Sequence, residues 1–200
     1  MSHILIKNGS LILYNKVLSG ANLLIRDEKI AAIGRSIRPR TALRGLTVID
    51  AKRRFVSAGF IDTHIHGDPG DIFRNELRHG TTSVLPVISC SASELRQRVS
   101  DVWEFIGRDP LGDNVLGIRL EGYFISPLRR GAQRMEFMQE PSLAAAKKIF
   151  RDCDGLLRIM TIAPELKGVQ ALTRFFRKNG VIVSLGHSYA DFRQSIAGID

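Results

Sequence analysis

The sequence predicts an α/β fold in which a parallel sheet follows a small β-rich segment. Short apolar runs separated by turn residues fill residues 1–57, which is typical of strands and tight turns. From residue 58 onward, apolar runs alternate with helix-like stretches, as they do in βα units with a parallel sheet. We therefore predict two domains, 1–57 and 58–200.

The first domain is expected to consist of short strands. Residues 3–13 (HILIKNGSLIL) hold two apolar runs around Asn8-Gly9, a strong hairpin signal. Residues 22–34 repeat the pattern around Asp27-Glu28. Residues 46–56 add another strand or pair of strands.

The second domain is expected to hold five strands, at residues 60–66, 81–89, 114–122, 156–165 and 181–188. Helices are predicted at 91–107, 142–152 and 168–180, and another begins after the last strand. Continuous apolar runs such as VIVSL at 181–185 suit strands covered on both faces. Asp68 and Asp71 are expected to lie in a loop, and His79-Gly80 is expected to form a helix C-terminal turn.

Polar residues stand where such a fold collects its functional groups, at the carboxyl ends of the strands. His64 and His66 close the first strand, Glu121 the third and His187 the fifth. Residues i and i+2 of a strand share one face, so both histidines can point into one site. Imidazole and carboxylate ligands favour zinc or iron. We interpret Glu165 as structural rather than a ligand.

A divalent ion at such a site activates water and polarises a carbonyl, which is the chemistry of amide or ester hydrolysis. The residues alone therefore predict a metal-assisted hydrolase on a βα scaffold. They identify neither the substrate nor the general base that the reaction also needs.

Composition excludes several other classes. Residues 1–60 carry 11 Lys and Arg against 3 acidic residues, but no aromatic interleaving or nucleic-acid motif accompanies them, so we expect no nucleic-acid partner. No apolar run is long enough to span a membrane, and the N-terminus lacks signal-peptide features. Two separated cysteines, Cys90 and Cys153, suit a reduced cytoplasmic protein.

Five motifs carry a resemblance to a known family. They are GFIDTHIHG (59–67), GTTSVLP (80–86), LGIRLEGYFISPLRRGAQ (116–133), TIAPE (161–165) and VSLGHS (183–188). In this order and spacing they resemble the N-acetylglucosamine-6-phosphate deacetylases of the amidohydrolase superfamily. The resemblance implies a metal-dependent (β/α)8 barrel with a small β-sandwich. It also implies hydrolysis of N-acetylglucosamine 6-phosphate to glucosamine 6-phosphate and acetate, with a homodimer when the enzyme is complete.

The resemblance also implies roles for individual residues. Glu121 matches the central metal-ligand carboxylate and His187 the metal-ligand histidine of the fifth strand. His64 and His66 match the pair kept by members able to hold a second metal, so one or two ions of zinc or iron are expected. The stretch Gly131, Ala132 and Gln133 matches the segment that faces the acetamido group and the sugar of the substrate.

Two departures keep other substrates open. Tyr123 stands where the family usually has Pro, and Gln133 stands where it usually has His. Gln can bind an amide or sugar oxygen but cannot carry a proton. Another amidohydrolase, acting on an N-acyl or a cyclic amide, therefore remains an alternative.

The extent of the match sets a further expectation. A (β/α)8 barrel takes about 250 residues, and residues 58–200 match its first five βα units, whereas 1–57 match part of the sandwich. No catalytic base is identifiable in 1–200, and the base is expected beyond Asp200. We therefore predict that the 200-residue chain is inactive alone, and a non-catalytic fragment remains an alternative.

Overall fold

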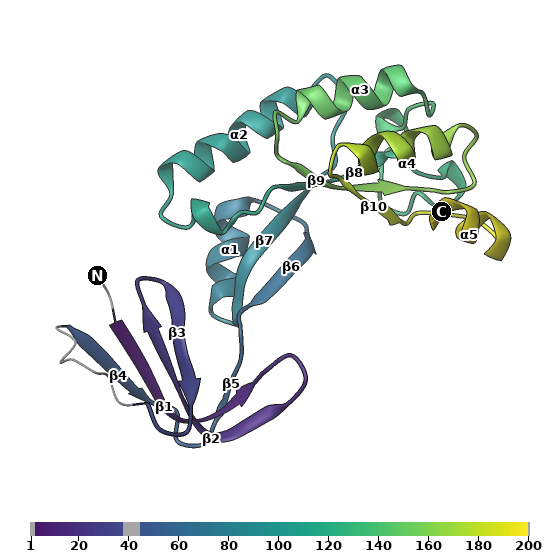
Figure 1. Cartoon of the computed structure of the whole chain (residues 1–200). Coiled ribbons are helices and arrows are strands. Elements are labelled where there is room, and N and C mark those ends of the chain that lie inside the picture. The colour runs from purple at the N-terminus through teal and green to yellow at the C-terminus, as the bar shows by residue number, and fades with distance from the viewer. Residues whose placement is uncertain (1–2, 38–44, 200) are drawn as a thin grey trace. The chain divides into compact units, whose positions relative to one another are not determined.

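The computed structural model describes residues 3–37 and 45–199, which form two compact units, Met1–Ala58 and Gly59–Asp200. Figure 1 labels the elements along the chain. No described helix is both long enough and apolar enough to cross a membrane.

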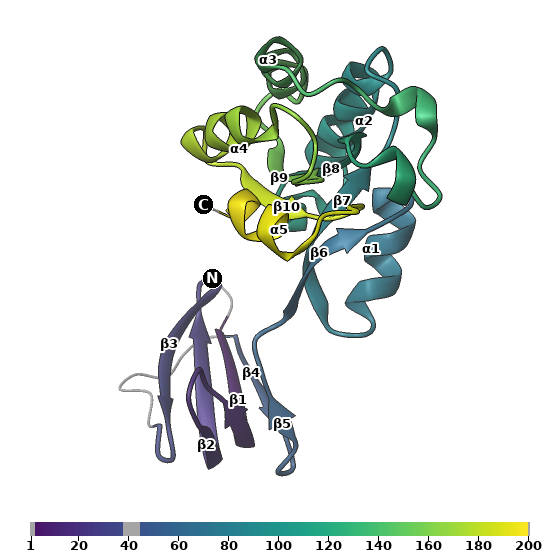
Figure 2. The same ribbon diagram turned by 90° about the vertical axis from the view of Figure 1, so that its right-hand side faces the viewer.

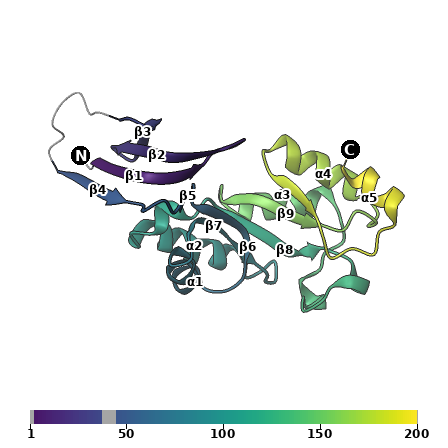
Figure 3. The same cartoon turned by 90° about the horizontal axis from the view of Figure 1, so that it is seen from below.

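The first unit is a mixed five-stranded sheet (Figure 3). Its strands are β1 (His3–Ile12), β2 (Val17–Arg26), β3 (Lys29–Gly34), β4 (Leu46–Asp50) and β5 (Phe55–Val56). The pairs β1–β2 and β2–β3 are antiparallel, whereas β4 and β5 both run parallel to β1. A small set of apolar side chains is buried here: Leu5, Leu11, Ala21 and Leu24.

The hairpin predicted at Asn8-Gly9 is wrong, because β1 runs through these residues as one strand. Asn8 has a φ of 57°, and the register against β2 shifts between Ile6 and Gly9, so the dipeptide forms a bulge. The hairpin predicted at Asp27-Glu28 is confirmed, with φ values of 48° and 65° in the turn between β2 and β3. Positive φ at both turn residues matches the twist of the strands.

The second unit is built on a parallel five-stranded sheet in the order β10-β9-β8-β7-β6. The strands are β6 (Phe60–Ile65), β7 (Thr81–Ile88), β8 (Ile118–Phe124), β9 (Leu157–Ile162) and β10 (Ile182–Leu185). Strands that pair in chain order with right-handed crossovers place their helices on one side. Figure 2 shows α1 to α4 in an arc outside β6–β10, the arrangement of half a barrel.

The helices are α1 (Pro69–Leu77), α2 (Leu95–Arg108), α3 (Leu143–Asp152), α4 (Val169–Lys178) and α5 (Phe192–Ile199). Each of the longer ones buries one face against the sheet. In α2, for example, the buried residues Leu95, Val99 and Val102 recur at helical spacing. These faces and the buried strands form one hydrophobic core.

The loop predicted at Asp71 is wrong, because Asp71 lies in α1, whereas Asp68 stands just before the helix. The helix C-terminal turn predicted at His79-Gly80 is confirmed, because both N–H groups donate to carbonyl oxygens at the end of α1. The Asp68 carboxylate caps this helix by accepting hydrogen bonds from the backbone N–H groups of Gly70 and Asp71. Phe73 is fully buried and anchors the helix. The helix brings the chain from the end of β6 back to the start of β7.

Candidate metal centre

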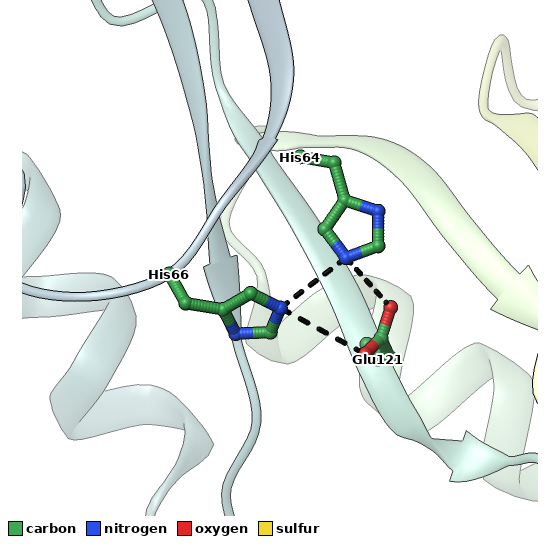
Figure 4. A group of neighbouring side chains, drawn as sticks. All are labelled: His64, His66 and Glu121. Carbon is green, nitrogen blue, oxygen red and sulfur yellow. Dashed lines mark hydrogen bonds and ion pairs between the residues drawn. The ribbon is translucent and has the colours of Figure 1, made fainter. Parts of the chain in front are cut away.

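The two histidines of the His-x-His stretch come together at the carboxyl end of β6. His64 lies in the strand and His66 follows it. The pairing of β6 with β7 shifts between Asp62 and Ile65, and Asp62 Oδ1 accepts a 2.9 Å hydrogen bond from the backbone N–H of His64. The two imidazole Nε2 atoms lie 3.2 Å apart (Figure 4). Asp62 therefore supports the irregular strand end that presents both rings.

Glu121 meets this pair from β8. Its side chain is 3% exposed, with Oε2 3.2 Å from His64 Nε2 and Oε1 3.9 Å from His66 Nε2 (Figure 4). The ligand atoms of His64, His66 and Glu121 all lie within 4.8 Å of one another. Such a spacing suits two imidazoles and a carboxylate around one cation.

His187 reaches the same carboxylate from the loop after β10. Its Nε2 lies 3.0 Å from Glu121 Oε1, and its Nδ1 lies 3.1 Å from the carbonyl oxygen of Arg129. A carbonyl can only accept, so Nδ1 carries a proton, and in a neutral ring the lone pair is then on Nε2, which faces a second acceptor, the Glu121 carboxylate. That tautomer is the one a metal ligand needs. His187 is not part of the group within 4.8 Å, and its role as a ligand stays a prediction.

The donor set fits a cation on chemical grounds. A lone pair of His187 Nε2 facing a carboxylate oxygen at 3.0 Å is repulsive unless a cation or a proton lies between them. Glu121 Oε2 is buried and forms no hydrogen bond within the described residues, although His64 lies close to it. A buried carboxylate oxygen without a hydrogen bond is costly. A divalent ion bound by these nitrogens and oxygens removes both penalties.

The backbone of His187 is strained and held. Its φ is 49°, and its carbonyl oxygen accepts a 2.9 Å hydrogen bond from the Ser126 N–H. Beside it, Glu165 accepts hydrogen bonds of 2.7 Å each from the Ser188 hydroxyl and the Tyr189 N–H. Burial raises the pKa of Glu165, but these hydrogen bonds outweigh it and hold the pKa below its usual range. Glu165 thus fixes the loop that carries His187.

Arg119 is a site residue that the sequence reasoning missed. It is 8% exposed, and its Nε lies 3.8 Å from Glu121 Oε2, while Nη2 donates a 3.0 Å hydrogen bond to Ser184. Burial, and then the charge of Arg119, lower the pKa of His64, which favours the neutral ring. Arg119 precedes Glu121 by two residues on the same face of β8, and that spacing is the signal that could have found it.

The stretch predicted to face the substrate lies beside these groups, after the short 3-10 turn Pro127–Arg129. Gly131 has a φ of 58°, and a Cβ there would lie 3.5 Å from the His187 ring. Ala132 is exposed, whereas Gln133 is 8% exposed and its Nε2 donates a 2.9 Å hydrogen bond to Glu121 Oε1. Contact of the three with substrate stays a prediction.

Tyr123, the other departure from the family pattern, points into the core. It is 1% exposed, and its hydroxyl donates a 3.4 Å hydrogen bond to the carbonyl oxygen of Ser91 and lies 3.6 Å from Cys90 Sγ. Burial raises the pKa of its hydroxyl. Tyr123 therefore packs between β8 and the loop after β7.

Relatives of the chain are found by sequence. It is 31% identical over 204 residues to an N-acetylglucosamine-6-phosphate deacetylase of Bacillus subtilis (strain 168), covering 94% of this chain and 51% of the relative. The human protein of the same name is 32% identical over 200 residues, covering 89% of this chain and 49% of that protein. The chain thus spans about half the length of the curated relatives it matches. No family model matches the sequence.

Solved structures with a similar fold carry the same name. The N-acetylglucosamine-6-phosphate deacetylase from Pasteurella multocida superposes on this chain with a TM-score of 0.78 at 26% sequence identity. The superposition covers 98% of this chain and 54% of that one. A D267A mutant from Mycobacterium smegmatis, solved in complex with N-acetyl-D-glucosamine-6-phosphate, superposes with a TM-score of 0.76 at 27% identity. It covers 100% of this chain and 54% of that chain.

Proposed function

This chain is related in sequence and fold to the N-acetylglucosamine-6-phosphate deacetylases, and on that premise we propose that it forms the metal-binding part of such an enzyme. The proposed reaction cleaves the acetamide C–N bond of N-acetylglucosamine 6-phosphate with water and yields glucosamine 6-phosphate and acetate. The single observation that carries the proposal is the convergence of His64 and His66 from β6 with Glu121 from β8.

The proposed cofactor is one or two ions of zinc or iron, held by His64, His66, Glu121 and His187. Such an ion, when bound, polarises the acetamide carbonyl and lowers the pKa of a coordinated water. The chain's own residues supply imidazole nitrogens and one carboxylate oxygen without a hydrogen bond to hold it. Gly131, Ala132 and Gln133 are proposed to orient the acetamido group. We assign no general base among the described residues.

The remaining assignments are part of the same proposal. Residues 1–57 are proposed to belong to a small β-sandwich, and 58–200 to the first five βα units of the barrel. A cytoplasmic location is supported by Cys90 and Cys153, which are both buried and unpaired. A homodimer follows from the resemblance alone.

The test of the reaction uses the protein produced from the intact gene and loaded with zinc. Acetate release is measured from N-acetylglucosamine 6-phosphate and from the unphosphorylated sugar. Ring opening, which releases no acetate, is followed separately for a cyclic amide. N-acetylgalactosamine 6-phosphate is included, because a 27% identical Escherichia coli O157:H7 relative carries the name of its deacetylase. We expect acetate from N-acetylglucosamine 6-phosphate in preference to the others, and none after Glu121→Ala. Turnover of the cyclic amide alone would contradict the assignment.

A further inference from the structure

A partly buried chain of polar contacts runs from the end of β7 to the candidate metal ligand Glu121. Ser89, just after β7, contacts Gln133 through its hydroxyl oxygen and the Gln133 side-chain carbonyl oxygen. The Gln133 amide nitrogen then donates a 2.9 Å hydrogen bond to Glu121 Oε1. Both ends of the Gln133 side chain are therefore engaged.

The chemistry of these groups fixes the direction of each hydrogen bond. An ionised carboxylate only accepts, so the Gln133 NH2 group must face Glu121 and its carbonyl must face Ser89. The Ser89 hydroxyl then donates to that carbonyl. Loss of the Ser89 hydroxyl removes one of the two hydrogen bonds that hold the amide in this orientation.

The surroundings hold Gln133 in place. Its backbone N–H donates to the Arg130 carbonyl at 3.0 Å, and its own carbonyl accepts a 2.7 Å hydrogen bond from Arg130 Nη1. Gly122 has a φ of 123°, and a Cβ there would lie 3.3 Å from Ser89 Oγ and 3.4 Å from Gln133 Oε1. A glycine after Glu121 thus leaves room for the two side chains.

The Glu121 carboxylate needs such a restraint. Rotation about the last torsion of a Glu side chain is broad, so packing alone sets it weakly. The Gln133 hydrogen bond falls on Oε1, which also lies 3.0 Å from His187 Nε2. Oε2 has no hydrogen bond and lies 3.2 Å from His64 Nε2 and 3.8 Å from Arg119 Nε. The arrangement leaves Oε2 available to a cation.

We infer that Gln133, oriented by Ser89, is a positioning residue that fixes the rotation of the Glu121 carboxylate and so presents Oε2 to the metal ion. The inference rests on the proposed function. It gives Gln133 a role in metal affinity that is separate from any contact with the substrate.

The experiment measures zinc affinity of the full chain by competition with a chromogenic chelator, together with the visible absorption spectrum of the cobalt-substituted protein. The variants are Gln133→Leu, which keeps the size and loses the hydrogen bonds, Ser89→Ala, and the double variant. Gln170→Leu is the matched control, because Gln170 is exposed on α4. Circular dichroism checks the fold of each protein.

We expect Gln133→Leu to weaken zinc binding by roughly 10–100-fold, the usual cost of losing a partner behind a metal ligand. Ser89→Ala should weaken it less and should have no further effect in the Gln133→Leu background, since Ser89 acts through Gln133. Both variants should change the cobalt spectrum, while Gln170→Leu should not.

Wild-type affinity and spectrum in folded Gln133→Leu would overturn the inference and leave the proposed function intact. If Ser89→Ala weakened zinc binding equally in wild type and in Gln133→Leu, Ser89 would not act through Gln133. If Gln133→Leu does not fold, Ser89→Ala decides, because unchanged affinity and spectrum there would also overturn the inference. A wild-type chain that binds neither metal would instead overturn the proposed site itself.

Discussion

His187 Nε2 lies 3.0 Å from Glu121 Oε1, although 66 residues separate the two in the sequence. The contact exists because both residues stand at the same edge of the parallel sheet, one in β8 and the other after β10. It joins the strand that carries the carboxylate to the loop held by Glu165.

Removal of one imidazole of the pair should weaken metal binding. His66→Ala leaves a zinc ion bound to His64 and Glu121 with one ligand fewer. Zinc affinity should therefore fall by more than the roughly 10–100-fold that is typical when a residue hydrogen-bonded to a ligand is lost. Competition with a chelator measures the change. The control is His79→Ala, because His79 is exposed and outside the cluster; an equal loss there would show that the pair has no special role.

Removal of the Glu165 carboxylate should loosen the loop of His187. Glu165→Ala leaves the Tyr189 N–H and the Ser188 hydroxyl without their acceptor. The free energy of unfolding in urea should fall by about 1–3 kcal/mol, and the amide of Tyr189 should exchange faster with solvent. Glu140→Ala, at an exposed position, serves as the control. Unchanged exchange at Tyr189 would argue against the role given to Glu165.

Asp152 should make stability depend on acid pH. Burial raises its pKa, but the hydrogen bonds from Lys148 and Arg96 outweigh it and hold the pKa below its usual range. A carboxyl whose pKa is lowered on folding stabilises the protein above its unfolded pKa of about 3.9. That stabilisation is lost as the pH falls through the lower folded value.

Urea unfolding of Asp152→Asn tests this pH dependence. The variant should be less stable than wild type at pH 7, and the difference should shrink once the pH falls below about 3.9. The exposed Asp113→Asn should show neither effect. A gap between wild type and Asp152→Asn that stays constant down to the lowest pH would contradict the prediction.

A methyl group at Gly117 should destabilise the second unit. Gly117 has a φ of 138°, and a Cβ there would lie 2.4 Å from the carbonyl oxygen of Leu156. Gly117→Ala should therefore cost more than the roughly 1 kcal/mol that a strain-free Gly→Ala change can add. Gly107→Ala, in α2 with open space around it, should stabilise by about 0.5–1 kcal/mol. Thermal unfolding compares the two, and equal effects would contradict this packing.

The sheet of the second unit could be predicted because its strands are apolar runs with helices between them. The secondary-structure prediction failed where one sequence pattern is compatible with two local structures. Asn8-Gly9 adopts the positive φ that a turn needs, but the same conformation also forms a bulge. The start of helix α1 was missed because Ile72, Phe73 and Leu77 are too few apolar residues to show a helical period.

Part of the candidate site could also be predicted from the sequence. His64, His66, Glu121 and His187 could be selected from their places at strand ends, where parallel strands bring their carboxyl ends together. Arg119 could have been selected from its two-residue spacing to Glu121 on one strand. Ser89 could not, because its relation to Glu121 depends on the register of β7 against β8, which the spacing of single residues does not specify.

X-ray absorption at the zinc edge of the zinc-loaded chain tests the central claim most directly. The account predicts a shell of nitrogen and oxygen ligands at about 2.0–2.2 Å with outer scattering from imidazole rings, and loss of stoichiometric zinc in Glu121→Ala. Zinc bound through sulfur at about 2.3 Å, or no zinc retained by the wild-type chain, would contradict the claim that His64, His66 and Glu121 form a metal centre.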